Sequence, residues 1–187
     1  LRDNPALWSA AAQYLHAEAG RTQSVSLPYY ERLDWVTQWF RQLWAESLGK
    51  LDGEGRSRGL TPVRALGATD QHSQLQLYLQ GPADKQFTLL MADDLVHAGD
   101  RIPARWSEQS AIAPLAGHTV GELLTAEFRA TRETLTRNGR PNRTLRLPTL
   151  DAGTLGELLM LLEVETVAVA ELLGIDAFDQ PAVEESK

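Results

Sequence analysis

Glu46 is the residue whose surroundings in the sequence most clearly predict chemistry. Projected at 100° per residue, it shares one flank of a helix with Trp35, Trp39 and Gln42, beside an apolar stripe. This pattern makes the helix apolar nearly all round and predicts that it is buried. Because loss of hydration raises the pKa of a carboxylate, Glu46 is a candidate general base. The alternative, a partly exposed glutamate near a helix end, is favoured by composition alone.

The histidines offer a second kind of chemistry. His72 lies near the start of an expected helix, where an imidazole can exchange protons near neutral pH. A surface histidine, or one with its hydrogen bonds satisfied, is the more common outcome for such a residue. The others, His16, His97 and His118, have no partner at metal-ligand spacing. We therefore expect no metal site, and nothing in the chain predicts a cofactor.

Three further segments carry weaker signals. Residues 52–59 (DGEGRSRG) follow a helix and open none, which favours a mobile surface loop over a phosphate-binding loop. The arginines between 129 and 146 lack interleaved aromatic residues, which favours a solvated face over a nucleic-acid patch. In the tail, Phe178 and Val183 predict that the chain packs down, and Lys187 could direct a cation into a cleft.

Alternating helices and strands are expected to position these residues. Periodicity and cap residues predict helices at residues 5–17, 30–48, 69–78, 119–139 and 154–174, the last two begun by capping boxes at Thr119 and Thr154. A short apolar run predicts a strand at 87–91, and segments closed by a proline predict strands at 24–27 and 144–147, with a long excursion over 94–117. The alternation predicts an α/β layer fold with a small, mostly parallel sheet of three or four strands.

Composition bounds the class of protein. The 187 residues are 43% hydrophobic and 23% charged, as expected for one globular domain. A net charge of −7 argues against wholesale attraction to nucleic acid or to an anionic membrane. The absence of cysteine excludes disulfides and thiolate metal sites, and fits a reducing compartment.

Neither end of the chain reads as a membrane or export signal. The apolar stretch 155–173 is interrupted by four glutamates, which predicts a buried helix of a soluble protein and no membrane span. The N-terminus has neither Met nor a signal pattern, so we expect a chain cut from something longer.

Three segments together resemble the C-terminal half of the glucose-6-phosphate isomerase (phosphoglucose isomerase) family. Residues 174–187 (GIDAFDQPAVEESK) are similar to its signature G-x-x-x-F-D-Q-x-G-V-E-x-x-K, with Ala182 in place of a glycine. Residues 42–50 (QLWAESLGK) are similar to its element Q-x-x-x-E-S-x-G-K. Residues 69–73 (TDQHS) are similar to the stretch that supplies its histidine, and all three occur in the family's order.

The resemblance implies a fold and an activity. The fold would be a three-layer α/β/α sugar isomerase (SIS) domain over residues 1–174, with residues 175–187 as a tail that closes the active site. The activity would be the cofactor-free interconversion of glucose 6-phosphate and fructose 6-phosphate in glycolysis and gluconeogenesis. The family also implies a cytoplasmic homodimer with a shared active site, in which the neighbouring subunit supplies the histidine.

The resemblance also implies roles for single residues. Glu46 would move the proton between C1 and C2 through a cis-enediol. His72 and Lys187 would assist opening of the sugar ring, and Gln42 and Gln180 would line the sugar site.

Two family elements have no match here. The glycine-arginine element and the Ser/Thr phosphate loop belong to the family's N-terminal half, so we expect this chain alone to be a half-site that isomerises poorly or not at all. Three other interpretations stay open: the isomerase portion of a longer fused protein, a non-catalytic sugar-phosphate binding module, and a structural assembly domain. Retention of Glu46, His72 and Lys187 argues against the binding module, whereas a last helix that is mostly subunit interface would favour the assembly domain.

Overall fold

Four parallel strands form the central sheet of the computed structural model, which describes residues 3–184. The strands are β1 (Gln23–Pro28), β4 (Thr61–Arg64), β5 (Lys85–Ala92) and β6 (Asn142–Leu147), in the order β4-β1-β5-β6. Every neighbouring pair is parallel. The expected strands and their parallel pairing are confirmed, and β5 is buried along its whole length.

Strand β4 was not expected, and its four residues, Thr-Pro-Val-Arg, include a proline. Pro62 has no N–H to donate and would interrupt a central strand. Position at the edge of the sheet removes this difficulty, since only one side of β4 has to pair.

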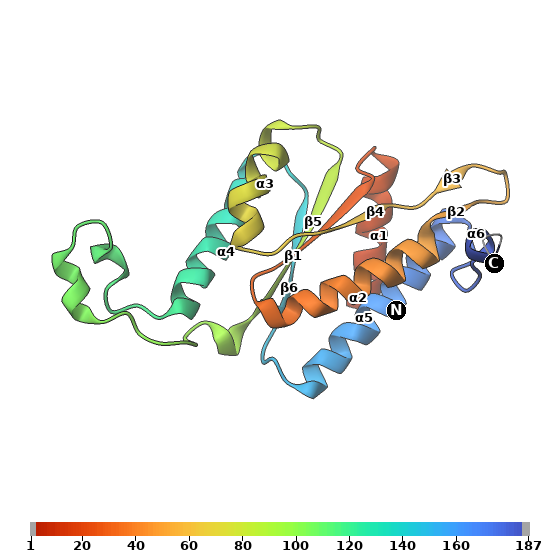
Figure 1. Ribbon diagram of the computed structural model, residues 1–187. Coiled ribbons are helices and arrows are strands. Elements are labelled where there is room, and N and C mark those ends of the chain that lie inside the picture. The colour runs from red at the N-terminus through yellow and green to blue at the C-terminus, as the bar shows by residue number, and fades with distance from the viewer. Residues whose placement is uncertain (1–2, 185–187) are drawn as a thin grey trace.

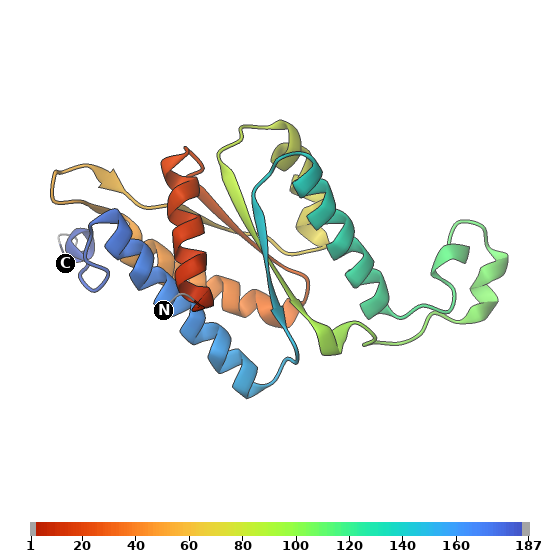
Figure 2. The same cartoon turned by 180° about the vertical axis from the view of Figure 1, so that it is seen from behind.

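Helices cover both faces of the sheet (Figures 1 and 2). Helices α1 (Pro5–Glu18), α2 (Glu31–Leu48) and α5 (Ala152–Leu173) lie on one face, and α3 (Thr69–Gln80) and α4 (Val120–Arg137) on the other. The alternation of side chains along β5 explains this division. Leu90 packs with Phe40 and Trp44 of α2, whereas Leu89 packs with Tyr78 of α3 and Phe128 of α4. The three-layer α/β/α architecture is therefore confirmed.

Cap residues set the helix boundaries. The capping box at Thr119 is present as expected, with Glu122 as its second member. The expected capping box at Thr154 is wrong. Helix α5 begins earlier, because the Asp151 carboxylate accepts a hydrogen bond from the Thr154 backbone N–H at 2.9 Å and so serves as the N-cap.

The excursion between β5 and α4 extends from the body as an arm (Figures 1 and 2). It contains three short 3₁₀ turns, η1 (Asp93–Leu95), η2 (Ala104–Glu108) and η3 (Ala113–Leu115). His97 and His118 lie at the two ends of the arm, and their Nδ1 atoms lie 3.0 and 2.9 Å from the two carboxylate oxygens of Glu122. One glutamate at the start of α4 thus joins both ends of the arm.

A small antiparallel hairpin follows α2, made by β2 (Lys50–Leu51) and β3 (Ser57–Arg58). The prediction of a loop over residues 52–59 is therefore wrong for Ser57 and Arg58, which form β3. The turn itself is ordered by Asp52, whose Oδ1 accepts hydrogen bonds from the backbone N–H groups of Glu54 and Arg56.

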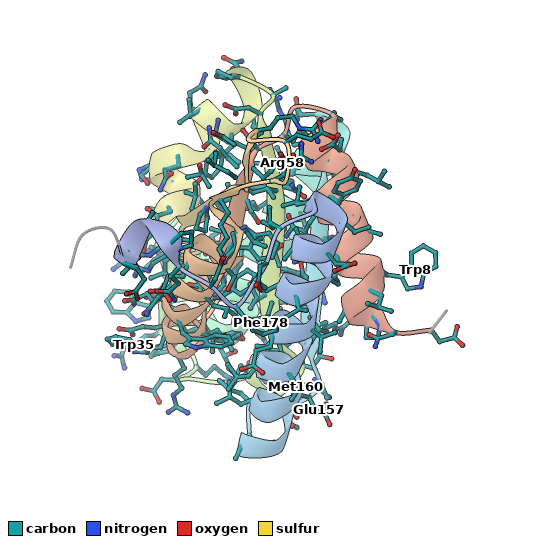
Figure 3. The ribbon with its side chains drawn as sticks, turned by 90° about the vertical axis from the view of Figure 1, so that its right-hand side faces the viewer. Trp8, Trp35, Arg58, Glu157, Met160 and Phe178 are labelled. Carbon is teal, nitrogen blue, oxygen red and sulfur yellow. The ribbon has the colours of Figure 1, made fainter. Side chains whose placement is uncertain are left out.

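Helix α5 is buried on one face only, so the expectation of a buried helix is half wrong. Leu158, Leu162 and Val169 pack inside, whereas Met160 is 58% exposed and Leu172 is also exposed (Figure 3). Among the described residues, no helix combines the length and the apolarity that crossing a membrane requires.

The expected solvated arginine face is wrong for Arg143. Its guanidinium lies 2.7 Å from Oε1 of Glu165, whose side chain is fully buried. The reason is its place on β6, where it faces α5 rather than water. Burial raises the pKa of Glu165, and the charge of Arg143 opposes that shift.

Candidate active site

A cleft forms where the end of α2, the hairpin and the chain's last turns meet. Its volume is about 610 Å³, and the tail reaches it as α6 (Pro181–Glu184), which lies beside β2 (Figure 1). The lining residues are Ala45, Glu46, Gly49, Lys50, Leu51, Ser57, Arg58, Gln180, Pro181, Ala182 and Val183. Two of the three sequence motifs, 42–50 and 174–187, therefore converge on one cleft although they are separated by more than a hundred residues.

Glu46, which lines the cleft, contacts two of the other expected site residues. Gln42 lies one helical turn before Glu46 and donates a hydrogen bond from Nε2 to Oε1 at 3.1 Å. Gln180 arrives from the tail and donates from Nε2 to Oε2 at 3.4 Å. The two amides therefore contact different oxygens of the Glu46 carboxylate, whose residue lines the cleft.

The expected burial of Glu46 among aromatic side chains is wrong. Glu46 is exposed and Trp35 is 71% exposed, with its ring on the outer side of α2 (Figure 3), while Trp39 is half-buried. The reason is that α2 packs on the sheet through one stripe, which includes Leu33 and Trp44. The flank that carries Glu46 faces the cleft and water instead.

Two cations line the cleft, and both are already paired. Lys50 Nζ lies 2.8 Å from the Asp179 carboxylate, and only 5% of the lysine side chain is exposed. Arg58 lies in β3 (Figure 3), and its Nη2 is 2.9 Å from the carboxylate of Glu18. The sequence signal for Lys50 was its place in the 42–50 motif, but nothing in that motif indicated its partner.

The tail does pack against the body, although not through the residues expected to do so. Phe178 is 83% exposed and Val183 is also exposed. Ile175 and Ala177 make the apolar contacts with the core instead. Lys50 supplies the polar contact, because it can reach the turn that follows Ala177.

His72 does not join this group within one copy of the chain. It is exposed near the start of α3, on the opposite face of the sheet from α2. There it lines a separate cleft of about 530 Å³ with Gln71, Leu75 and Glu127 among others. Lys187 lies outside the described residues. Within residues 3–184, no group of three or more acidic or histidine side chains is placed to hold a metal ion.

Comparison with known proteins places the chain in a family. The family model described as "Phosphoglucose isomerase" matches residues 2–187. The chain belongs to the phosphoglucose isomerase family. Its similarity to curated phosphoglucose isomerase relatives is high: it is 46% identical to the glucose-6-phosphate isomerase of Rubrobacter xylanophilus over 187 residues, or 99% of the chain. It is also 46% identical to a probable glucose-6-phosphate isomerase of Natronomonas pharaonis.

Solved structures share this fold. A hypothetical protein from Thermus thermophilus superposes with a TM-score of 0.88 at 38% identity, over 97% of this chain and 43% of that one. A glucose-6-phosphate isomerase from Chlamydia trachomatis superposes with a TM-score of 0.78 over 99% of this chain and 37% of that one. At 21% identity, this second likeness shows the fold alone. The chain spans 42% of the length of the two curated phosphoglucose isomerases named above.

Proposed function

We propose that this chain is the part of a glucose-6-phosphate isomerase that carries its catalytic base. The whole enzyme would interconvert glucose 6-phosphate and fructose 6-phosphate, a step of glycolysis and gluconeogenesis. The observation that carries the proposal is the meeting of Glu46 and Gln180 in one cleft, with Gln42 bonded to the same carboxylate from the preceding helical turn. Membership of the phosphoglucose isomerase family supports it.

Glu46 is the proton carrier in this proposal. From the open-chain aldose, its carboxylate removes the proton on C2, and the electron pair of that C–H bond forms the C1–C2 double bond of a cis-enediol as O1 takes up a proton. Glu46 then returns its proton to C1, while O2 loses its own proton and becomes the ketone oxygen. Gln42 and Gln180 each donate one hydrogen bond to the carboxylate and so keep a lone pair directed at the substrate. Because Glu46 is exposed in this chain, its water has to be displaced by the sugar and by the rest of the enzyme.

The position of His72 supports a shared site. His72 and Glu46 lie on opposite faces of one sheet, so a single copy does not bring them together. We propose a homodimer in which a second copy presents His72 to the Glu46 cleft, where it and Lys187 assist ring opening. Residues 1–174 then act as one SIS domain, residues 175–187 as the tail that closes the active site, and the enzyme works in the cytoplasm.

The chain by itself is proposed to be a half-site. The cations that line the cleft are engaged by Asp179 and Glu18, so neither is free to hold a phosphate or a developing enediolate. The remaining length of the enzyme would supply those charges. The half-site can therefore be tested by comparing the chain alone with the chain joined to the remaining part of a relative.

The test follows exchange of the protons on C1 and C2 by NMR, with fructose 6-phosphate in heavy water. Two proteins are compared: the 187-residue chain, and a chimera in which it replaces the matching 42% of the Rubrobacter xylanophilus relative. We expect negligible exchange with the chain and ready exchange with the chimera. Glu46→Gln should lower the chimera's rate by roughly 10²–10⁴-fold while ligand affinity is kept.

The control is Glu31→Gln, which removes an exposed carboxylate from the other end of α2 and should leave exchange unchanged. A chimera that binds the sugar phosphate but exchanges equally well with and without the Glu46 carboxylate contradicts the proposal. A chimera that binds the sugar phosphate and never exchanges it would instead indicate a binding module.

A further inference from the structure

Lys50 holds the tail by three oxygen atoms of a single turn. Its Nζ donates to the backbone carbonyl of Asp176, to the carbonyl of Asp179 at 2.5 Å, and to the Asp179 carboxylate at 2.8 Å. A lysine ammonium has three protons to donate, so this set uses all of them. The lysine side chain is 5% exposed, whereas the carboxylate side chain of Asp179 is 56% exposed, so only the lysine half of the ion pair is shielded from water.

The part of the tail that follows these contacts lies at the surface. After Ala177, residues 178–184 are all exposed, and α6 has only four residues. A helix this short is not stable on its own. The hydrogen bonds and ion pair of Lys50 thus hold the tail immediately before Gln180, which lines the cleft.

The geometry ties this anchor to the candidate base. Glu46 and Lys50 are four residues apart at the end of α2 and the start of β2, and their partners Gln180 and Asp179 are consecutive. We propose that Lys50 and Asp179 are positioning residues, which set the register that places Gln180 on the carboxylate of Glu46. Neither touches the substrate in this scheme. The inference deepens the proposed function, and only its kinetic part depends on that function.

The first test measures the tail directly, in the 187-residue chain, by hydrogen–deuterium exchange of residues 176–184. Lys50→Met keeps the length of the side chain and removes the charge, and should raise exchange there roughly 10–100-fold. Lys50→Arg should restore most of the protection, and Asp179→Asn should give an intermediate loss because both carbonyl contacts remain. The matched control is Lys85→Met, since Lys85 is 8% exposed and pairs with Asp84 away from the tail.

A second measurement separates positioning from mere packing. The side-chain amide of Gln180 is followed by NMR in the chain with and without Glu46→Ala. When Lys50 is present, Glu46→Ala should shift the Gln180 amide resonance. When Lys50→Met is also present, Glu46→Ala should leave that resonance unmoved. Tail exchange that is the same in the Lys50 and Lys85 variants, or an equal shift in both backgrounds, would overturn the proposal.

The kinetic arm uses the active chimera. Lys50→Met should lower kcat more than it raises KM, because the base remains while its orientation is lost, and Lys50→Arg should recover most of kcat. Unchanged kcat in Lys50→Met would count against positioning. If every chimera lacks activity while both measurements on the tail come out as expected, the proposed function fails and the positioning role stands.

Discussion

Arg143→Met should be one of the most damaging substitutions outside the candidate active site. Arg143 donates from Nη2 to Glu165 at 2.7 Å and from Nε to the buried Thr88 hydroxyl at 2.9 Å. The arginine side chain is 21% exposed, but Glu165 is not exposed at all. Removal of the arginine therefore leaves a carboxylate in the core with no counter-charge.

The magnitude follows from that asymmetry. Breaking a buried ion pair by removing one partner costs about 3–5 kcal/mol of unfolding free energy, because the other charge stays buried and unpaired. Removing both charges by Arg143→Met with Glu165→Leu leaves no such charge, so the double variant should be more stable than Arg143→Met alone. As a control, Arg146→Met on the same strand breaks an exposed pair with Asp93 and should cost about 0–1 kcal/mol.

The cost should depend on pH with a defined sign. Burial holds the pKa of Glu165 above its ordinary value of 4.5, and loss of Arg143 raises that pKa further. Between the unfolded and the folded pKa the folded chain binds more protons than the unfolded chain, so stability falls as the pH rises. The penalty of Arg143→Met should thus be largest at neutral pH and should shrink towards pH 4.5.

Urea unfolding followed by circular dichroism from pH 5 to 8 measures both effects. The reasoning requires a cost for Arg143→Met that grows with pH and is relieved in the double variant. A pH-independent cost equal to that of Arg146→Met would refute it.

Three other perturbations can be tested by urea unfolding, extended down to pH 2 for the two carboxylate variants. Hydrogen bonding to His118, to a backbone N–H and to a second histidine lowers the pKa of Glu122 to about 2. This contributes stability above about pH 4.5 that is lost as the pH falls towards 2. Glu122→Gln should flatten the fall of unfolding free energy with acid, and an unaltered slope would exclude the contact between Glu122 and the histidines. Gly121→Ala would place a Cβ 2.2 Å from a backbone carbonyl oxygen and should cost about 1–3 kcal/mol, whereas Gly156→Ala, on an open helix surface, should be neutral or stabilising. Asp34→Asn should cost about 1 kcal/mol at pH 7 because its arginine partner is partly exposed. An arginine holds the pKa of Asp34 below its ordinary value, so that cost should fade below about pH 4, and a constant cost would contradict the ion pair.

The parts of the fold that follow from local pattern could be predicted from the sequence. An apolar run located β5, short segments closed by a proline located β1 and β6, and the capping box at Thr119 located the start of α4. The failures involve competition between local signals or pairing at a distance. Thr154 and Asp151 both suit an N-cap, and the choice depends on how the chain leaves β6. Strand β4 forms only because β1 offers it a parallel neighbour.

In the candidate site, too, local contacts could be predicted from the sequence and contacts that depend on packing could not. Glu46 and Gln42 are four residues apart on one helix, so their contact follows from periodicity. The exposure of Glu46 does not, because it depends on which stripe of α2 meets the sheet. Aromatic residues on both flanks made that stripe ambiguous, and Trp35 was assigned to the interior although it is 71% exposed.

The contact between Lys50 and Asp179 has a consequence for synthesis of the protein. The two residues are 129 positions apart, with α3, β5, α4, β6 and α5 between them. A ribosome delivers Glu46 and its helix early, but the other wall of the cleft only after Asp179 and Gln180 have left the exit tunnel. A nascent chain therefore carries the carboxylate during the synthesis of these intervening elements without the cleft that would direct it. The cleft is completed only near the end of translation of this stretch.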